Sequence, residues 1–237
     1  MIPLRDLNPT RTFPFVTLLL ILANSAVFLF EVTLRPRVLD QFTLAYGAIP
    51  FEISHNVDLA PKIALPVYVT LLISMFIHGG WLHIIGNMLY LWIFGKNIED
   101  RFGHAKFLAI YLIWGVVAGL TQVLIGPNER TPAVGASGAI AGVLGAYLVI
   151  FPRARVDTLL TIGIFFTAIQ LPAILVIGQW IVIQFFNGFL SLGASAGQEG
   201  VAYFAHIGGA VAGIVVGLVY RALGPPAPTV YSSAPRL

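Results

Sequence analysis

The stretch Gly135-Ala136-Ser137-Gly138-Ala139-Ile140-Ala141-Gly142 places one hydroxyl group among small residues at the start of an apolar segment. Further along, Ala205-His206-Ile207-Gly208-Gly209 places a histidine in a similar setting, with few charges nearby and an apolar run behind it. A serine becomes a nucleophile when a neighbouring base takes its proton, and histidine commonly supplies that base. Ser137 and His206 are therefore a candidate nucleophile and base, provided that the topology of the chain brings them together.

The composition is that of a membrane protein. Of the 237 residues, 58% are hydrophobic and 10% are charged, whereas soluble domains carry about 25% charged residues. Apolar runs of about 20 residues, long enough to cross a bilayer as helices, recur along the whole chain. With no internal repeat and no second domain visible, we expect one all-α polytopic domain in the lipid bilayer.

Charge and motif patterns exclude several classes of function. The net charge is +3, but the 13 Lys and Arg residues stand singly between apolar runs, as loop anchors do, so we expect no nucleic-acid partner. The chain has no cysteine, which excludes disulfides and thiolate ligands. It also lacks the His-Glu-x-x-His motif of zinc proteases and an aspartate pair within the spans, and we expect neither a metal nor a cofactor.

Six apolar segments divide the chain. Residues 1–13 read as a cytoplasmic N-terminal tail, residues 14–222 as the membrane domain, and the Pro-rich residues 223–237 as a disordered tail. The first segment is too long for the apolar part of a signal peptide, so we expect an uncleaved span. A long connection, about 35–66, has amphipathic parts that suit the membrane interface. The predicted spans are about 14–34, 82–95 with an apolar lead-in at 67–77, 107–125, 137–151, 172–191 and 201–222.

Length alone does not fix the limits of the fifth span. The roughly 35 mostly apolar residues from 158 to 193 are too many for one straight span and few for two spans with a turn between them. Pro172 offers a division. We predict that residues 158–170 form a re-entrant or interfacial lead-in and that the span itself follows.

The positive charges orient the predicted spans. With six spans both termini lie on one side, and that side holds more Lys and Arg than the other, where only Arg35, Arg37, Lys62 and Arg130 fall. The positive-inside rule therefore predicts cytoplasmic termini. The second, fourth and sixth spans then all run from outside to inside. Four polar residues share one depth near the outer face: His83, Asn87, Ser137 and His206.

A wet pocket at that depth follows from the short fourth span. Residues 137–152 reach only about 24 Å as a helix, less than the roughly 30 Å of a hydrocarbon core, so Ser137 lies below the surface. Irregular backbone before it is tolerated there only beside protein or water. Small residues let helices approach closely, and two glycine stripes could bring His206 to Ser137: Gly138, Gly142 and Gly145 on the fourth span, and Gly209, Gly213 and Gly217 on the sixth.

The polar residues support a catalytic dyad. No carboxylate falls at this depth, so we expect no third member. Asn87 lies one helical turn after His83, and both could donate to an oxyanion beside the Ser137 N–H, where one donor is worth about a hundredfold to a thousandfold in rate. Taken singly, a serine, Asn or His in a span usually bridges or packs helices. Several polar groups converging at one depth favour function, whereas His78 reads as structural.

Four groups of residues between about 67 and 217 complete the pattern: His78-Gly79-Gly80-Trp81-Leu82-His83 with Asn87, Phe94-Gly95 with Glu99-Asp100 and Gly103, Gly135-Ala136-Ser137-Gly138, and Ala205-His206 with Gly209 and Gly213. In order and spacing they resemble the rhomboid family of intramembrane serine proteases. The resemblance implies a six-helix core in which Ser137 attacks a peptide bond, His206 is the general base, and His83 and Asn87 with the Ser137 N–H form the oxyanion hole.

The resemblance also implies substrates and an entry route. Substrates would be single-span membrane proteins with helix-destabilising residues near the cut, entering sideways past the fifth span. Trp180, Phe185 and Phe186 on that span are possible gate residues, although ordinary core or lipid-facing aromatics are the commoner reading. Two departures from the family stand out: Val69-Thr70 replaces a Trp-Arg pair that many members carry, and Ala141 replaces an aromatic that in some members lies under the histidine ring.

The sequence thus predicts a serine endopeptidase that cleaves single-span membrane proteins in or near their transmembrane segment. The alternative is a catalytically silent rhomboid-like scaffold that binds or dislocates membrane proteins, which the intact Ser–His pair disfavours. A small transporter is disfavoured by the lack of inverted repeats. Short loops and the absence of a targeting peptide favour a bacterial inner membrane.

Overall fold

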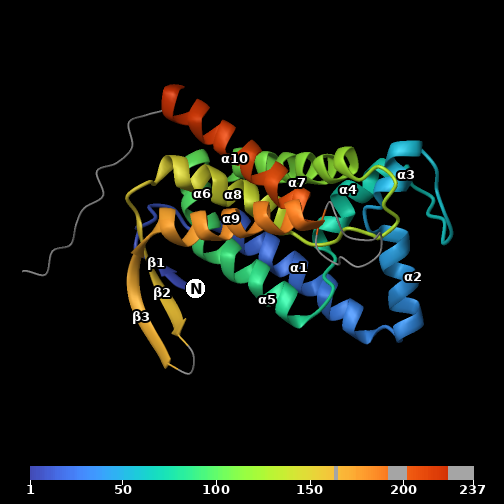
Figure 1. Cartoon of the computed structure of the whole chain (residues 1–237), viewed down its shortest axis with the longest axis horizontal. Coiled ribbons are helices and arrows are strands. Elements are labelled where there is room, and N and C mark those ends of the chain that lie inside the picture. Colours follow the sequence, from blue (N-terminus) through green and yellow to red (C-terminus); the bar gives the residue numbers. More distant parts are fainter. Residues whose placement is uncertain (163–164, 192–201, 224–237) are drawn as a thin grey trace, which may run out of the picture.

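The computed structural model describes residues 1–162, 165–191 and 202–223. Its long helices pack side by side into a bundle with a small β-sheet at one end (Figure 1). At the other end lie the short helices α2 (Pro36–Tyr46), α3 (Pro50–His55) and α4 (Thr70–Ile73). The predicted disordered tail, apart from Leu223 at the end of α10, lies outside the described residues.

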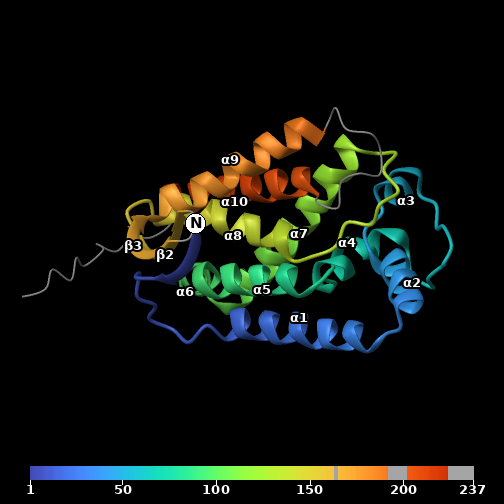
Figure 2. The same cartoon turned by 60° about the horizontal axis from the view of Figure 1, so that its bottom comes forward.

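The bundle is built from the apolar segments. Across the bundle, the helices follow in the order α1, then α5 and α6, then α7 and α8, and finally α9 and α10 (Figure 2). A short π-helical turn, Leu91–Gly95, joins α5 to α6. The helices are α1 (Phe15–Thr33), α5 (Trp81–Tyr90), α6 (Lys96–Phe102), α7 (His104–Ile125), α8 (Ser137–Ile150), α9 (Ala173–Ser191) and α10 (Tyr203–Leu223).

The protein is an integral, multi-pass membrane protein. Within the described residues, α1, α7, α9 and α10 are each long and apolar enough to cross a bilayer, and the bent pair 67–76 and 81–102 makes up to five spans. The fourteen residues of α8 are apolar but shorter. The count of six spans and the cytoplasmic termini therefore stay predictions.

The connection after α1 holds two helices, α2 (Pro36–Tyr46) and α3 (Pro50–His55). The predicted lead-in to α5 forms three short helical turns, at Val67–Val69, Thr70–Ile73 (α4) and Ser74–Phe76. The chain then turns by 83° into α5. Gly80, with φ of +155°, lies at this turn, where an L side chain would be strained.

The segment predicted as a re-entrant or interfacial lead-in, residues 158–170, lies within two paired β-strands. Strands β2 (Arg155–Ile162) and β3 (Phe165–Pro172) pair antiparallel, and β1 (Ile2–Asp6) adds to the other edge of β2. The segment is rich in β-branched and aromatic residues, which favour extended backbone. The N-terminal residues therefore contribute a strand, and a small sheet supplements the predicted all-α fold.

A buried carboxylate fastens the start of α1 to α6. The first N–H groups of a helix lack partners within it and carry partial positive charge. Glu99 on α6 accepts from the N–H of Val16 at 2.7 Å and from both the N–H and the hydroxyl of Thr17, at 2.7 and 2.6 Å. This cap orients α1 against the bundle.

The predicted glycine stripes pack α8 directly against α10. A Cβ atom added at Gly209 would lie 2.0 Å from the carbonyl oxygen of Gly138, and one at Gly213 would lie 1.9 Å from that of Gly142. Only glycine leaves room for such an approach. The contact begins one residue after Ser137, so it positions the first turn of α8 beside α10.

Candidate active site

Ser137 is the first residue of α8 and follows a turn that only glycine adopts easily. Gly135 has φ of +117°, and its N–H donates to the carbonyl of Ser74 at 2.8 Å. The N–H of Ser137 is one of the helix's first donors, which lack intrahelical acceptors. The serine thus combines a hydroxyl with a free backbone donor at the positive end of a helix dipole.

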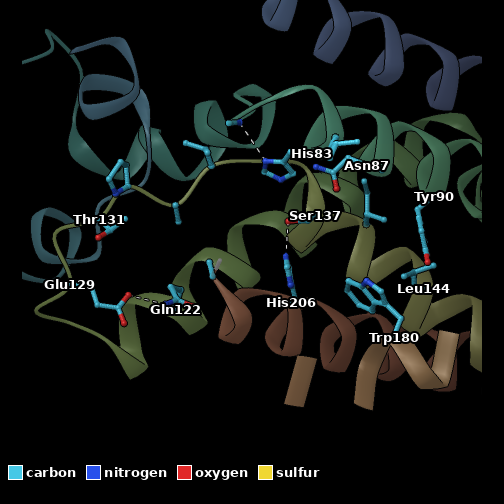
Figure 3. Close-up of a pocket in the computed structure, with 18 residues that line it drawn as sticks. His83, Asn87, Tyr90, Gln122, Glu129, Thr131, Ser137, Leu144, Trp180 and His206 are labelled. Atoms are coloured by element: carbon cyan, nitrogen blue, oxygen red, sulfur yellow. Dashed lines mark hydrogen bonds between the residues drawn. The ribbon is translucent and has the colours of Figure 1, made fainter. Parts of the chain in front are cut away.

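His206 lies in the second turn of α10 and faces this serine. Its Nε2 is 2.7 Å from Ser137 Oγ, and its ring is buried (Figure 3). The close contact between Gly209 and Gly138 holds the two helices at the required separation. The structure therefore brings the predicted nucleophile and base within hydrogen-bond distance.

The opposite side of the His206 ring contacts α9, which the sequence analysis did not foresee. Nδ1 lies 2.7 Å from Oε1 of Gln184, and the Trp180 ring packs beside the imidazole with centroids 5.5 Å apart. Trp180 thus provides an aromatic neighbour for the histidine that Ala141 does not. A polar partner is also present, but it is an amide rather than a carboxylate.

His83 and Asn87 lie on the face of α5 that packs against the turn preceding Ser137. A Cβ atom at Gly135 would lie 2.6 Å from His83 Nε2 and 3.5 Å from Asn87 Nδ2. Gly79 N–H donates to His83 Nδ1 at 3.4 Å, which leaves Nε2 as the protonated, donating nitrogen. Asn87 Nδ2 is buried and has no hydrogen-bond partner among the residues that the structure describes. Two donors therefore converge on the space beside Ser137.

A cavity of about 600 Å³ contains all four predicted residues. Figure 3 shows Ser137, His206, His83 and Asn87 near its centre. One end is polar and the other apolar. Gln122, Glu129 and Thr131 line the polar end, and Tyr90, Leu144 and Trp180 line the apolar end.

Gln122 on α7 supports the first turn of α10. Its Oε1 accepts from the N–H of Ala205 at 3.3 Å, and its Nε2 donates to Glu129 at 2.8 Å. Since Ala205 precedes His206, this bridge helps to fix where α10 begins. The sequence held no signal for it, because a single glutamine near the end of a span belongs to no motif.

The sequence also led to predictions for His78, Phe185 and Phe186. The N–H of His78 donates to the buried carboxylate of Glu31, at 3.3 and 3.2 Å to its two oxygens, and the His78 ring packs edge-on to His83. These contacts fit the structural role predicted for His78, which stays a prediction. Phe185 and Phe186 are exposed on α9. No group of three or more His, Asp or Glu side chains within the described ranges could hold a metal ion.

Comparison with known proteins identifies a family. The Rhomboid domain family matches residues 66–223. The chain is 26% identical over 204 residues to Rhomboid-like protein 11, chloroplastic, of Arabidopsis thaliana, which covers 82% of this chain and 64% of that protein. It is 39% identical over 93 residues to Rhomboid protease GluP of Bacillus subtilis, covering 39% and 18%.

A third relative is human presenilin-associated rhomboid-like protein, mitochondrial, 31% identical over 147 residues, with 61% of this chain and 36% of that protein covered. This chain therefore belongs to the rhomboid family of membrane proteins. In each of these relatives the alignment covers less than two thirds of the relative's own length.

Proposed function

We propose that this protein is an intramembrane serine endopeptidase. The observation that carries the proposal is the 2.7 Å contact between Ser137 Oγ and His206 Nε2 inside a cavity lined by further donors. A helix-packing serine needs no base and no unpaired amide opposite it. The name of the Bacillus subtilis relative, a rhomboid protease, supports the same activity.

The arrangement accounts for each step of peptide hydrolysis. His206 Nε2 takes the hydroxyl proton as Ser137 Oγ attacks the carbonyl carbon, and the C=O electron pair moves to oxygen. The Ser137 N–H, Asn87 Nδ2 and His83 Nε2 donate to that oxyanion. The imidazolium returns the proton to the leaving amine, and water then hydrolyses the acyl-enzyme with His206 again as base.

The polarity of the cavity supports a membrane-embedded substrate. Leu144, two helical turns after Ser137, and Tyr90, one turn after Asn87, line its apolar end. Glu129 and Thr131 line the polar end. An extended segment that leaves a transmembrane helix and enters water would meet both environments in that order. Single-span membrane proteins, entering past α9 where Phe185 and Phe186 are exposed, are therefore the proposed substrates.

Six spans with cytoplasmic termini remain our proposal for the topology, since the Lys and Arg distribution supports it. The bacterial inner membrane has no support over other membranes. The relatives carry chloroplastic and mitochondrial names as well as a Bacillus subtilis source.

Co-expression with a single-span reporter tests the proposed activity. Wild type should cleave the reporter, whereas Ser137→Ala and His206→Ala should abolish cleavage and still give folded protein in detergent. Cleavage retained by Ser137→Ala would contradict the proposal. Folded wild type that cleaves none of a panel of reporters, but binds them, would support the silent scaffold instead.

A further inference from the structure

Gln184 is a buried polar residue on α9, a mostly apolar helix whose other polar residues, Gln179, Asn187 and Ser191, are exposed or half-buried. The buried residues of α9, a helix described throughout, are Ala173, Val176, Ile177, Gln184 and Gly188. Burying an amide without a hydrogen bond costs about 1–3 kcal/mol. The described contact that offsets this cost is with His206 Nδ1, at 2.7 Å.

That contact selects between the two neutral forms of the His206 ring. As base, His206 needs a lone pair on Nε2 to accept the Ser137 proton, so its own proton must be on Nδ1. The Gln184 oxygen accepts that Nδ1–H. With the Gln184 amide oriented as in the structure, the other tautomer would place a lone pair on Nδ1 opposite a lone pair on Oε1. Nε2–H would then point at the serine oxygen, where it cannot act as base.

We infer that Gln184 is a positioning residue that holds His206 in its Nδ1–H tautomer and steadies the imidazolium formed during the reaction. This inference rests on the proposed protease function. Gln184 thus takes the place that a carboxylate occupies in a Ser–His–Asp triad, as a neutral acceptor suited to a low-dielectric site, where an isolated ionised carboxylate is costly.

The location of Gln184 on α9 links this role to the packing of the helix. Trp180, one turn earlier on the same face, also contacts the His206 ring. In the most apolar stretch of α9, 22% of the residues are buried, a smaller share than in α1, α7 or α10. The α9 helix, which is less buried than these three helices, therefore provides the contacts of Gln184 and Trp180 with His206. His206 is positioned to act as base when α9 lies against α10.

Two substitutions of similar size separate hydrogen bonding from packing. Gln184→Glu keeps acceptor oxygens at the same reach, whereas Gln184→Met keeps the length and removes them. Labelling by a fluorophosphonate serine probe and reporter cleavage are measured for both. Val182→Met, on the exposed face of α9, is the control for a methionine in this helix.

Gln184→Met should lower kcat about 100-fold with KM little changed, less than the about 10⁴-fold lost when a triad histidine adopts the wrong tautomer. Gln184→Glu should stay within about tenfold of wild type, a loss that is small beside the triad effect, and Val182→Met should match wild type. Equal loss in the Glu and Met variants, or none in Gln184→Met, would overturn the inference.

A second measurement does not depend on catalysis or on the stability of the Glu variant. Nitrogen NMR of histidine-labelled protein, with the His206 signals assigned by their loss in His206→Ala, reports which ring nitrogen carries the proton. Wild type should show the Nδ1–H form, and Gln184→Met a mixture. An Nε2–H form in wild type would overturn the inference, whereas absent probe labelling of wild type would instead count against the protease function.

Discussion

At the residue scale, the unpaired amide of Asn87 is the least expected feature of the site. Buried polar groups in folded proteins nearly always have partners, and one without a partner costs about 1–3 kcal/mol. Asn87 Nδ2 is buried near Gly135 and the start of α8, and it has no partner within the described ranges of the chain. A donor held ready for a charge that appears only during the reaction explains this cost.

Replacing Asn87 by alanine should therefore separate activity from stability. We expect kcat to fall by about a hundredfold to a thousandfold, as when one oxyanion donor is removed, while the thermal midpoint is unchanged or higher. Kinetics on a cleaved reporter and thermal unfolding in detergent measure the two quantities. Asn24→Ala is the matched control, because the buried Asn24 on α1 donates to the carbonyl of Leu20 and lies outside the cavity.

For Asn24→Ala the expectation is the reverse, with lower stability and unchanged kinetics. If Asn87→Ala lost stability and kept its rate, Asn87 would be a helix-bridging residue.

The residues that sequence alone could place are those carried by motifs. His83, Asn87, Ser137 and His206 were predicted to share one depth, and the structure gathers all four around one cavity; their catalytic roles stay proposals. Gln184 could not be placed, because α9 carries two glutamines, Gln179 and Gln184, and neither belongs to a periodic or motif pattern. Its contact depends on the rotation of α9 about its axis, which only tertiary packing fixes.

At the element scale, the contact of α8 with α10 sets the distance between nucleophile and base. Gly213 faces the carbonyl of Gly142, and Gly145 faces that of Ala210. The spacing of these glycines in the sequence was enough to predict this pairing. It rests on a local rule: small residues repeated at helical spacing give a smooth face.

A methyl group in this contact should push the helices apart. Gly213→Ala should destabilise the protein by about 1–3 kcal/mol, as overpacking does, and should lower activity because His206 moves away from Ser137. Gly178→Ala is the matched control, since no described residue comes within 4 Å of a Cβ atom at Gly178 on α9. Thermal unfolding in detergent and probe labelling compare the two. Equal behaviour of both variants would show that the glycine contact does not set the site.

The β2–β3 hairpin shows where element prediction failed. Residues 158–170 are apolar enough to be taken for a re-entrant or interfacial lead-in, and hydropathy alone does not separate a short apolar strand from a helical segment. The partner strand β1 comes from the distant N-terminus, with Arg5 opposite Asp157. Such long-range pairing leaves no local pattern in the sequence.

At the scale of the whole molecule, a buried carboxylate ties the sheet to the bundle. Asp6, the last residue of β1, accepts from the Tyr147 hydroxyl on α8 at 2.7 Å and from the Asn97 side chain on α6. The N–H of Asn8 also donates to it, at 2.9 Å. Burial raises the pKa of Asp6 from 3.8 to about 6, although these hydrogen bonds act in the opposite direction.

Stability should therefore depend on pH through Asp6. Because the folded state holds this proton more tightly than the unfolded state, the stabilisation is complete below about pH 4 and is lost as the pH rises to about 6. Asp6→Asn should remove this part of the dependence and stabilise the protein at pH 7 by at most about 3 kcal/mol. Thermal unfolding of wild type and Asp6→Asn from pH 4 to 7 measures it.

An unchanged difference in thermal midpoint between pH 4 and pH 7 in Asp6→Asn would mean that Asp6 is ionised in the fold throughout this range.

The most direct test of the central claim, an activated Ser137, is labelling of the detergent-purified protein by a fluorophosphonate or isocoumarin serine probe. Wild type should be labelled, and labelling should disappear in both Ser137→Ala and His206→Ala while the thermal midpoints show that both variants are folded. Folded wild type without labelling, or labelling that persists in Ser137→Ala, would contradict the account.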